Sequence, residues 1–225
     1  MRKIAVLTGA GISAESGIKT FRDADGLWEG HDIMEIASPE GWNRNPSKVL
    51  EFYNIRRRQL LEVEPNAAHF AIVELEKKYN VNIITQNIDD LHERAGSKNV
   101  LHLHGELLKV RSCDDEDVIL DWKKDLNHGD LCPRNSQLRP HVVWFGEAVP
   151  MFPLAAEITI AADIIIIIGT SMQVYPAASL LDFKRETTTV YFIDPKPAIH
   201  PHSSIKIIQQ NAVIGVVELV KQLLQ

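Results

Sequence analysis

Cysteine is scarce in this sequence, which holds only Cys113 and Cys132 among its 225 residues. Two cysteines do not make a disulfide framework, and such low usage is typical of the reducing cytoplasm. Long apolar runs are lacking as well. The longest, residues 164–168 with their neighbours, falls far short of the roughly 20 residues that a membrane-spanning helix needs. We therefore expect a cytoplasmic protein without a membrane partner.

An excess of positive charge is also absent. The chain has 24 Lys and Arg residues against 30 Asp and Glu residues, a formal net charge of −6. This balance argues against a nucleic-acid-binding surface and mildly favours basic partners, such as lysine-rich segments of other proteins. The length is enough to bury the core of one large domain, with or without a smaller insertion.

The strongest positive signal is a glycine-rich stretch close to the N-terminus. The apolar run 3–7 is followed at once by Gly9-x-Gly11-x-x-Ala14, the pattern of the strand, tight turn and helix start of a dinucleotide-binding fold. We expect the glycines to let backbone N–H groups approach a phosphate, and the following helix to direct its positive end at it. A glycine-rich turn that binds nothing is the alternative, because short motifs also occur by chance.

The residues after Gly17 do not continue as an ordinary dinucleotide-binding unit. Such a unit reaches a second strand that ends in an acidic residue within about 30 residues. Here the segment is rich in glycine and polar residues and is not strand-like. We interpret it as a loop, with Phe21, Arg22, Leu27 and Trp28 available to close over a ligand.

Strand and helix patterns alternate along the rest of the chain. This alternation predicts an α/β, Rossmann-like fold with a mainly parallel sheet and helices on both faces, plus a smaller inserted module. Strands are expected at 81–85, 100–104, 163–168, 189–193 and 205–208, and an extended segment at 142–145. Helices are expected at 46–64, 66–78, 154–162 and 213–224.

We predict one domain, 1–225, built from two parts. The Rossmann-like core is assigned to 1–30, 81–110 and 140–225, and the smaller module to 31–80 and 111–139. Residues 111–139 are polar and turn-rich, and Trp122, Leu126 and Leu131 are expected to form their small core.

Polar or glycine-containing clusters follow five of the apolar runs. In parallel sheets ligands bind beyond the carboxyl ends of the strands, so these clusters are expected to converge on one edge. They are Gly9-Ala10-Gly11, Gln86 to Asp89, His104-Gly105, Gly169 to Ser171, and Asp194. A coincidence of ordinary turn residues is the alternative reading.

His104 is the candidate base among nine histidines, because it follows a predicted strand at this edge. A structural histidine satisfied by hydrogen bonds is the alternative. His102 is expected on the opposite strand face. Asn87 and Asp89 suit ribose hydroxyls or an amide, although either could cap the helix that follows.

Six motifs together resemble the sirtuins, NAD-dependent protein-lysine deacylases, and occur in that family's order over nearly the whole chain. They are Gly9-Ala-Gly-Ile-Ser13, Thr20-Phe-Arg-Asp23, Gln86-Asn-Ile-Asp89, His102-Leu-His-Gly105, Val142-Val-Trp-Phe-Gly-Glu147 and Gly169-Thr-Ser171. The resemblance implies that NAD is surrounded by Gly9, Ala10, Gly11, Ser13, Phe21, Arg22, Gln86, Asn87, Ile88, Asp89, Gly169, Thr170, Ser171, Asp194 and Ala212.

The resemblance also implies the chemistry. Asn87 and His104 are implied as catalytic residues, with His104 as the general base. In the family the acyl-lysine oxygen attacks the nicotinamide ribose, nicotinamide leaves, and the histidine deprotonates a ribose hydroxyl that attacks the resulting imidate. The products are free lysine, nicotinamide and O-acyl-ADP-ribose. Residues 142–147 would pair with an acyl-lysine peptide as an added strand, with Val143, Phe145 and Gly146 in contact with it.

Tyr53 and Arg56 bear on the kind of acyl group. Three residues apart on a helix, they share a face, and a guanidinium with a phenol can grip a carboxylate. From the residues alone Tyr53 could equally be core and Arg56 part of a solvated face. The pair resembles the sirtuin subgroup that removes succinyl, malonyl or glutaryl groups, which predicts desuccinylation beside deacetylation.

The chain departs from most sirtuins in one respect, the structural zinc held by two Cys-x-x-Cys pairs. Only Cys113 and Cys132 are present, with Asp114, Asp115 and His128 nearby. Structural zinc sites favour thiolate-rich sets of four ligands, so we predict no metal.

Three other functions stay open from the sequence. The same cofactor chemistry allows protein ADP-ribosylation, and a non-catalytic NAD-binding module is a further alternative. A hydride-transferring dehydrogenase is disfavoured, because the acidic second-strand signal is missing.

Overall fold

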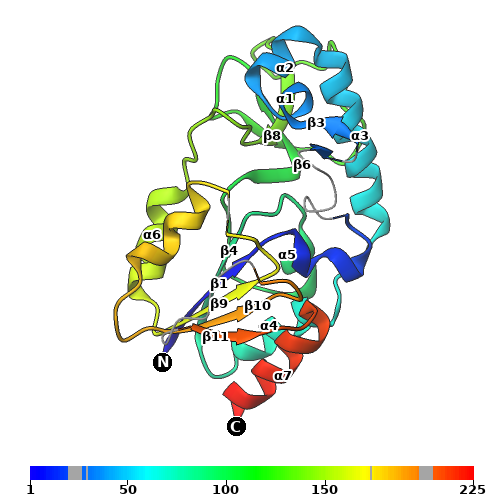
Figure 1. The fold of residues 1–225 in the computed structure, drawn as a ribbon. Coiled ribbons are helices and arrows are strands. Elements are labelled where there is room, and N and C mark those ends of the chain that lie inside the picture. The colour runs from blue at the N-terminus through cyan, green and yellow to red at the C-terminus, as the bar shows by residue number, and fades with distance from the viewer. Residues whose placement is uncertain (20–26, 29, 173, 198–204) are drawn as a thin grey trace.

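The computed structural model describes residues 1–19, 27–28, 30–172, 174–197 and 205–225. A six-stranded sheet forms the lower part of the molecule in Figure 1, and a smaller module built around a three-stranded sheet forms the upper part. The predicted loop residues Phe21 and Arg22 lie outside the described residues.

The described chain contains the following elements in order. They are β1 (Lys3–Thr8), η1 (Ala10–Ile12), η2 (Ala14–Ser16), β2 (Leu27–Trp28), β3 (His31–Asp32), α1 (Ile33–Ile36), α2 (Pro39–Arg44), α3 (Pro46–Glu62), α4 (Ala67–Leu75), β4 (Asn80–Thr85), α5 (Leu91–Ala95), β5 (Val100–His102), β6 (Gly105–Ser112), β7 (Ile119–Asp121), β8 (Leu138–Val142), α6 (Phe152–Ala161), β9 (Ile164–Ile168), η4 (Ala177–Phe183), β10 (Thr189–Ile193), β11 (Ile205–Ile208) and α7 (Ala212–Leu224).

The large sheet has the strand order β11-β10-β9-β1-β4-β5, and all its pairings are parallel. The order reverses at β1, which lies between β4 and β9. Thr8, the last residue of β1, is therefore level with Thr85 on one side and Ile168 on the other. Ligands bind at such switch points in doubly wound sheets, because the loops diverge there. The α/β, Rossmann-like prediction is confirmed.

Helices cover both faces of this sheet (Figure 1). On one face Ile4, Val6 and Ile166 pack with residues of α4 and α7, and on the other Ala5, Leu7 and Ile167 pack with α6 and η4. All five isoleucines of β9 are buried, because the strand is covered on both sides. A continuous apolar run without alternation is the pattern of such a strand.

The smaller module is joined to the sheet by a helix with clear sequence signals. Pro46 occupies the first turn of α3, and the Asn45 side chain caps it by accepting from the Lys48 N–H at 3.1 Å. The inner face of α3, including Phe52 and Tyr53, packs against residues of β6 and β8. This packing fixes α3 beside the strand that follows His104.

Several local predictions are wrong. No regular helix follows Gly11, where the chain forms the two short 3₁₀ helices η1 and η2. The strand expected at 100–104 ends at His102, and a strand not expected there, β8, ends at Val142, where the predicted extended segment 142–145 begins. In both places the chain leaves one sheet for a neighbouring element, which an apolar pattern does not report.

The proposed division of the chain also needs correction. Helix α4, assigned to the smaller module, packs on the large sheet against α7. Strand β6, assigned in part to the Rossmann-like core, pairs with β7 and β8 in the small sheet. Within residues 111–139, Leu126 is fully buried and Trp122 packs beside it, but Leu131 is half exposed.

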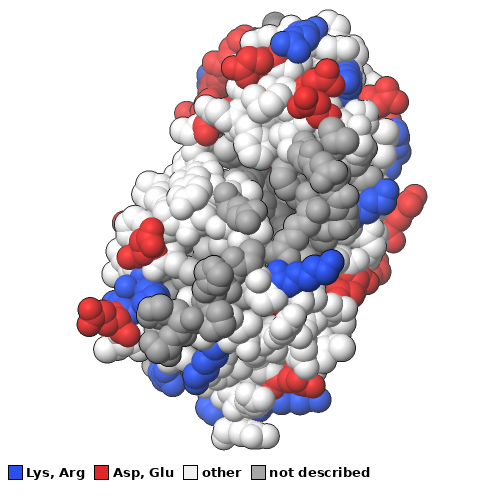
Figure 2. All heavy atoms as spheres, in the orientation of Figure 1, with Lys and Arg blue, Asp and Glu red and all other residues white. Residues whose placement is uncertain are grey.

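Charges are interspersed on the face of the molecule that Figure 2 shows. Figure 2 shows one face of the molecule, where acidic and basic side chains alternate and do not gather into a patch of one sign. The described helices include none with both the length and the apolar character that crossing a membrane requires.

Candidate active site

The glycine turn after β1 lies against a second glycine turn, the one after β9. The Gly11 N–H donates to the Gly169 carbonyl at 2.9 Å, and a Cβ added to Gly11 would lie 2.5 Å from the Gly169 Cα. Gly9 is similarly close to Thr170. These glycines therefore serve a backbone contact between two loops at the switch point, a role that the sequence pattern did not reveal.

A relay of polar side chains connects this turn with residues 86–89. The Asn87 amide donates to the Gly9 carbonyl at 3.2 Å and to the Ser13 hydroxyl at 3.3 Å. The Ser13 hydroxyl in turn donates to the Asp89 carboxylate at 3.0 Å. Asn87, Ser13 and Asp89 are all buried, so the three side chains hold one another in place.

The Gln86 side chain extends the same cluster to the loop after β9, because its amide donates to the Thr170 hydroxyl at 3.1 Å. The structure thus brings four of the five predicted clusters into contact or into adjacent positions. The fifth, Asp194, follows β10 at the same edge of the sheet, and its carboxylate accepts from the Lys196 N–H at 2.8 Å.

Three successive carbonyl groups bind the loop 86–88 to the segment that carries His104. His104 Nδ1 donates to the Gln86 carbonyl at 3.0 Å, and His102 Nδ1 donates to the Asn87 carbonyl at 3.1 Å. The Leu107 N–H donates to the Ile88 carbonyl at 2.8 Å. The orientation of each of these peptide groups is consequently fixed.

His104 has the properties of a general base. A carbonyl accepts hydrogen bonds only, so Nδ1 carries the proton and the neutral ring presents an unprotonated Nε2. Burial lowers the pKa of His104 below its ordinary value, against a smaller opposing effect of the Gln86 carbonyl. The imidazole is therefore neutral near pH 7 and able to accept a proton.

The pKa of the Asp89 carboxyl group is subject to opposing effects. Burial raises its pKa to about 6, while the Leu91 N–H, the Ser13 hydroxyl and the charge of His102 act to lower it. Its carboxylate also accepts from the Leu91 N–H at 3.2 Å, at the start of α5. Asp89 is thus part of the polar cluster and also bonds the first N–H of the following helix, whose N-cap residue is Asp90.

Tyr53 and Arg56 lie on α3 as their spacing predicts, but in different environments. Tyr53 is fully buried, and its hydroxyl accepts from the Trp144 indole at 3.0 Å. The Arg56 guanidinium stacks on the Phe52 ring at 3.6 Å and donates to the Phe52 carbonyl at 3.1 Å. Through Trp144 the tyrosine touches the segment 142–147.

That segment is held by one partly buried carboxylate. Glu147 accepts from Arg139 at 2.7 Å, from Arg111 at 3.1 Å and from the Trp144 N–H at 2.8 Å. Phe145 and Gly146 are exposed and Val143 is half-buried. The N–H groups of Val143 and Phe145 already donate to the His104 and Ala37 carbonyls. A peptide strand added here would therefore use other backbone groups of the segment.

The remaining predicted residues have simpler places. Ala10 begins η1, and Ala212 begins α7. Ile88 packs against the hydrophobic cluster that contains Phe52 and Tyr53, and Ser171 follows Thr170. Phe21 and Arg22 lie outside the described part of the chain.

Sequence reasoning missed two histidines beside this site. His102 was expected on the opposite strand face from His104, yet the two rings bond adjacent carbonyls of the same loop. Residues two apart on a strand point to the same face, so the alternation rule groups these histidines and does not separate them. The other is His92, whose Nε2 lies 3.1 Å from the Thr8 hydroxyl at the end of β1. Its position, the second residue of α5, carried no distinctive signal.

Cys113 is exposed and Cys132 is buried, and both are free thiols. Cys132 Sγ lies 3.5 Å from the Ser112 hydroxyl and accepts from the Arg134 N–H at 3.4 Å. Over the residues that the structure describes, no group of three or more His, Cys, Asp or Glu side chains could hold a metal ion. The residues present do not fit the four-ligand zinc site of most sirtuins.

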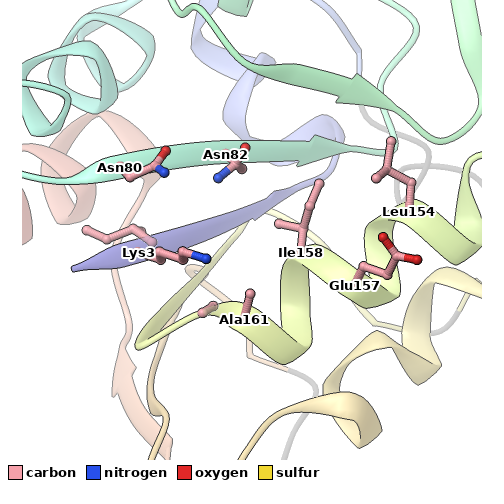
Figure 3. A pocket seen from close by; sticks show the side chains of 9 residues that line it. Lys3, Asn80, Asn82, Leu154, Glu157, Ile158 and Ala161 are labelled. Atoms are coloured by element: carbon pink, nitrogen blue, oxygen red, sulfur yellow. The ribbon is translucent and has the colours of Figure 1, made fainter. Parts of the chain in front are cut away.

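One cavity of about 200 Å³ lies elsewhere in the molecule. It is lined by Lys3, Asn80 and Asn82 of the sheet and by Leu154, Glu157 and Ile158 of α6 (Figure 3). Lys3 and Asn80 are the first residues of β1 and β4. The cavity is therefore at the amino ends of the strands, away from the edge that carries His104.

Comparisons of sequence identify relatives along the full chain. A model of the Sir2 family matches residues 9–176. A Helicobacter pylori relative named NAD-dependent protein deacylase is 60% identical over 226 residues, which cover 100% of this chain and 99% of the relative. A Bacteroides thetaiotaomicron relative of the same name is 52% identical over 231 residues, covering 100% and 98%.

Comparisons of structure agree. A Sir2 homologue solved in complex with NAD has a TM-score of 0.88 and 40% identity, covering 98% of this chain and 88% of that one. A Sir2 protein bound to an acetylated peptide has a TM-score of 0.82 and 28% identity, covering 98% and 93%.

Proposed function

Because this chain belongs to the Sir2 family, we propose that it is an NAD-dependent protein-lysine deacylase that transfers the acyl group from lysine to ADP-ribose. The observation that carries the proposal is His104, a neutral imidazole with its protonated nitrogen fixed on the Gln86 carbonyl. It stands beside the relay of Asn87, Ser13 and Asp89, at the edge of the sheet where dinucleotides bind.

The residues present fit NAD as a co-substrate. The polar side chains of residues 86–89 are suited to ribose hydroxyls and to the nicotinamide amide, and the buried relay presents them in fixed orientations. In the proposed reaction the lysine acyl oxygen displaces nicotinamide from its ribose. His104 then accepts the proton of a ribose hydroxyl, which attacks the acyl carbon. Lysine leaves as the free amine, and a water molecule opens the resulting cyclic intermediate, so that the acyl group remains on ADP-ribose.

We propose that the peptide lies along residues 142–147. The network of Glu147, Arg111 and Arg139 holds this segment directly after β8, and the Val143 N–H bonds it to the His104 carbonyl. Backbone hydrogen bonds along such a segment give affinity with little dependence on side chains. The substrates are accordingly acyl-lysine residues in proteins of the cytoplasm, a location that the two free thiols also favour.

The product distinguishes deacylation from the related alternative. Incubation with NAD labelled in its adenylate and an acetyl-lysine protein should give labelled O-acetyl-ADP-ribose in the small-molecule fraction and free lysine on the protein. Label bound covalently to protein, with the acetyl group retained, would show an ADP-ribosyltransferase instead. NAD binding without nicotinamide release would show a non-catalytic module.

We further propose that the enzyme removes acidic acyl groups, succinyl and malonyl, as well as acetyl. Arg56 stands one turn after Tyr53, and Tyr53 touches the proposed peptide segment through Trp144. A hydroxyl that accepts one hydrogen bond can still donate its own hydrogen, so Tyr53 is able to serve a carboxylate beside Arg56.

Replacing Arg56 by methionine tests this specificity. A charge-assisted pair contributes about 1.5–3 kcal/mol, so kcat/KM for a succinyl-lysine peptide should fall by about tenfold or more, with little change for the acetyl-lysine peptide. The matched control is Arg58→Met. Arg58 is on the same helix as Arg56, but it is exposed and paired with Asp125. Equal losses on both peptides in Arg56→Met would rule out the carboxylate role.

A further inference from the structure

We propose that His102 is a positioning residue for this active site, acting as a positively charged bridge between the Asn87 carbonyl and the Glu93 carboxylate. This inference rests on the proposed function, because its purpose is to hold Asn87 where NAD binds. His102 itself acts through Asn87 and does not touch the reacting groups.

The protonation of His102 follows from its two partners. Nδ1 lies 3.1 Å from the Asn87 carbonyl oxygen, and Nε2 lies 2.8 Å from Glu93 Oε1. A carbonyl and a carboxylate are both acceptors, so both ring nitrogens must carry hydrogen to make the two bonds, which only the imidazolium does. His104 differs, because its described hydrogen bond engages Nδ1 with a carbonyl and is compatible with a neutral ring.

Burial makes this bridge sensitive to its surroundings. The His102 side chain is 8% exposed. Burial acts to lower the pKa of His102, but the hydrogen bond and charge of Glu93, the charge of Glu106 and the Asn87 carbonyl together raise it above its ordinary value. Of the other ionisable neighbours, Asp89 is stabilised as a carboxylate by His102, and His92 is disfavoured as a cation by it.

Asn87 is the group that the bridge would position. Its N–H donates to the Thr85 hydroxyl at 3.0 Å, and its side chain donates to Gly9 and Ser13. The His102 bond completes this set by fixing the Asn87 carbonyl. Glu93 is on α5, so the bridge ties both Asn87 and this helix to β5.

The charge requirement predicts a loss of binding at high pH. As the pH rises through the raised pKa of His102, the ring loses one proton and one of the two bonds, and Asp89 loses a nearby positive charge. The KM for NAD should then increase, while the neutral His104 is unaffected. Acidic conditions act differently, because there the protonation of His104 reduces kcat.

The test measures kcat and the KM for NAD from pH 6 to pH 9 with an acetyl-lysine peptide. In wild type the KM should rise at the alkaline end. In Glu93→Gln, which keeps an acceptor but removes the charge, this rise should move to lower pH by about one unit. In His102→Gln the KM should be raised about tenfold with a smaller change in kcat, and should not depend on pH. His128→Gln, an exposed histidine, should match wild type.

An alkaline rise that stays in place in both variants, or a KM within about twofold of wild type in His102→Gln, would overturn the proposal. If His102→Gln does not fold, Glu93→Gln decides alone, because Glu93 is 40% exposed and glutamine keeps its shape.

Nitrogen NMR of the His102 ring separates this proposal from the proposed function. Turnover with a singly protonated ring at pH 7 would overturn the bridge alone. A doubly protonated ring that loses a proton in Glu93→Gln, in a protein without turnover, would support the bridge and overturn the proposed function.

Discussion

At the scale of single residues, Asp89 shows how this site balances stability against chemistry. The carboxylate is buried, which raises its pKa to about 6, and it accepts from Ser13 and from the Leu91 N–H. Because the folded state holds its proton more tightly than the unfolded chain, ionisation of Asp89 lowers stability as the pH rises from about 4 to about 6. The group is kept although it destabilises the fold at neutral pH.

Asp89→Asn should therefore stabilise the protein near pH 7, by up to about 3 kcal/mol for a shift of this size. Its advantage over wild type should shrink as the pH falls from 6 to 4, where wild-type Asp89 becomes neutral as well. Urea denaturation of both proteins at pH 7 and pH 4.5 measures the difference. A difference that does not depend on pH would contradict the charge explanation. NAD binding should weaken in the variant.

The residues that follow the predicted strands indicated much of the site. The remaining contacts depend on local geometry that a sequence pattern does not contain. His104, Asn87 and Asp89 were expected together because each follows an apolar run, and the structure brings them to one edge. His102 was assigned to the wrong face, because residues two apart along a strand share a face, and the structure brings it to the same loop as His104. The Ser13 link between Asn87 and Asp89 depends on a tertiary contact that no spacing reports.

At the scale of elements, the two glycine turns at the switch point act as one unit. Gly169 has a φ of +59°, and an added Cβ would lie 2.5 Å from backbone atoms of Gly11 and Ile12. The glycine pattern predicted a turn and a helix start, but the chain forms two 3₁₀ helices there. Their place is set by tertiary contacts, since the Asn66 side chain before α4 donates to the Ile12 carbonyl and the Ser16 hydroxyl.

Gly169→Ala should combine strain with a backbone clash. Left-handed backbone costs a non-glycine residue about 1–2 kcal/mol, and the clash should bring the total loss above about 3 kcal/mol. Gly129→Ala is the matched control, because Gly129 has a φ of +93° with open space around it, so only the backbone cost applies. Chemical denaturation compares the two. Equal losses would show that the contact between the turns does not constrain the fold.

At the scale of the whole molecule, the sheet and the smaller module meet where the site is built. The alternation of strand and helix patterns along the sequence predicted the parallel sheet and its helices, because each of these patterns is local. The allocation of α4 and β6 between the two parts was wrong, since it depends on which surface each element covers. Residues 111–139 are held by packing of Leu126, Cys132 and Leu138 against Val110 and Leu50.

This packing predicts that the smaller module needs no metal. Dialysis against a strong chelator should leave the thermal unfolding midpoint and the deacylase activity unchanged, because apolar burial supplies the stability that zinc ligation gives most sirtuins. Metal analysis of the purified protein checks the same point independently. One tightly bound zinc ion per chain, lost together with stability on chelation, would contradict it.

Deacylase activity is tested most directly by measuring nicotinamide release and O-acyl-ADP-ribose formation from NAD with acetyl- and succinyl-lysine peptides, in wild type, His104→Ala and His128→Ala. Wild type and His128→Ala should each give one nicotinamide and one O-acyl-ADP-ribose per lysine freed. In His104→Ala the rate of O-acyl-ADP-ribose formation should fall by about 100-fold or more. Absence of nicotinamide release from wild type with every peptide, or an unchanged rate of O-acyl-ADP-ribose formation in His104→Ala, would contradict the assignment.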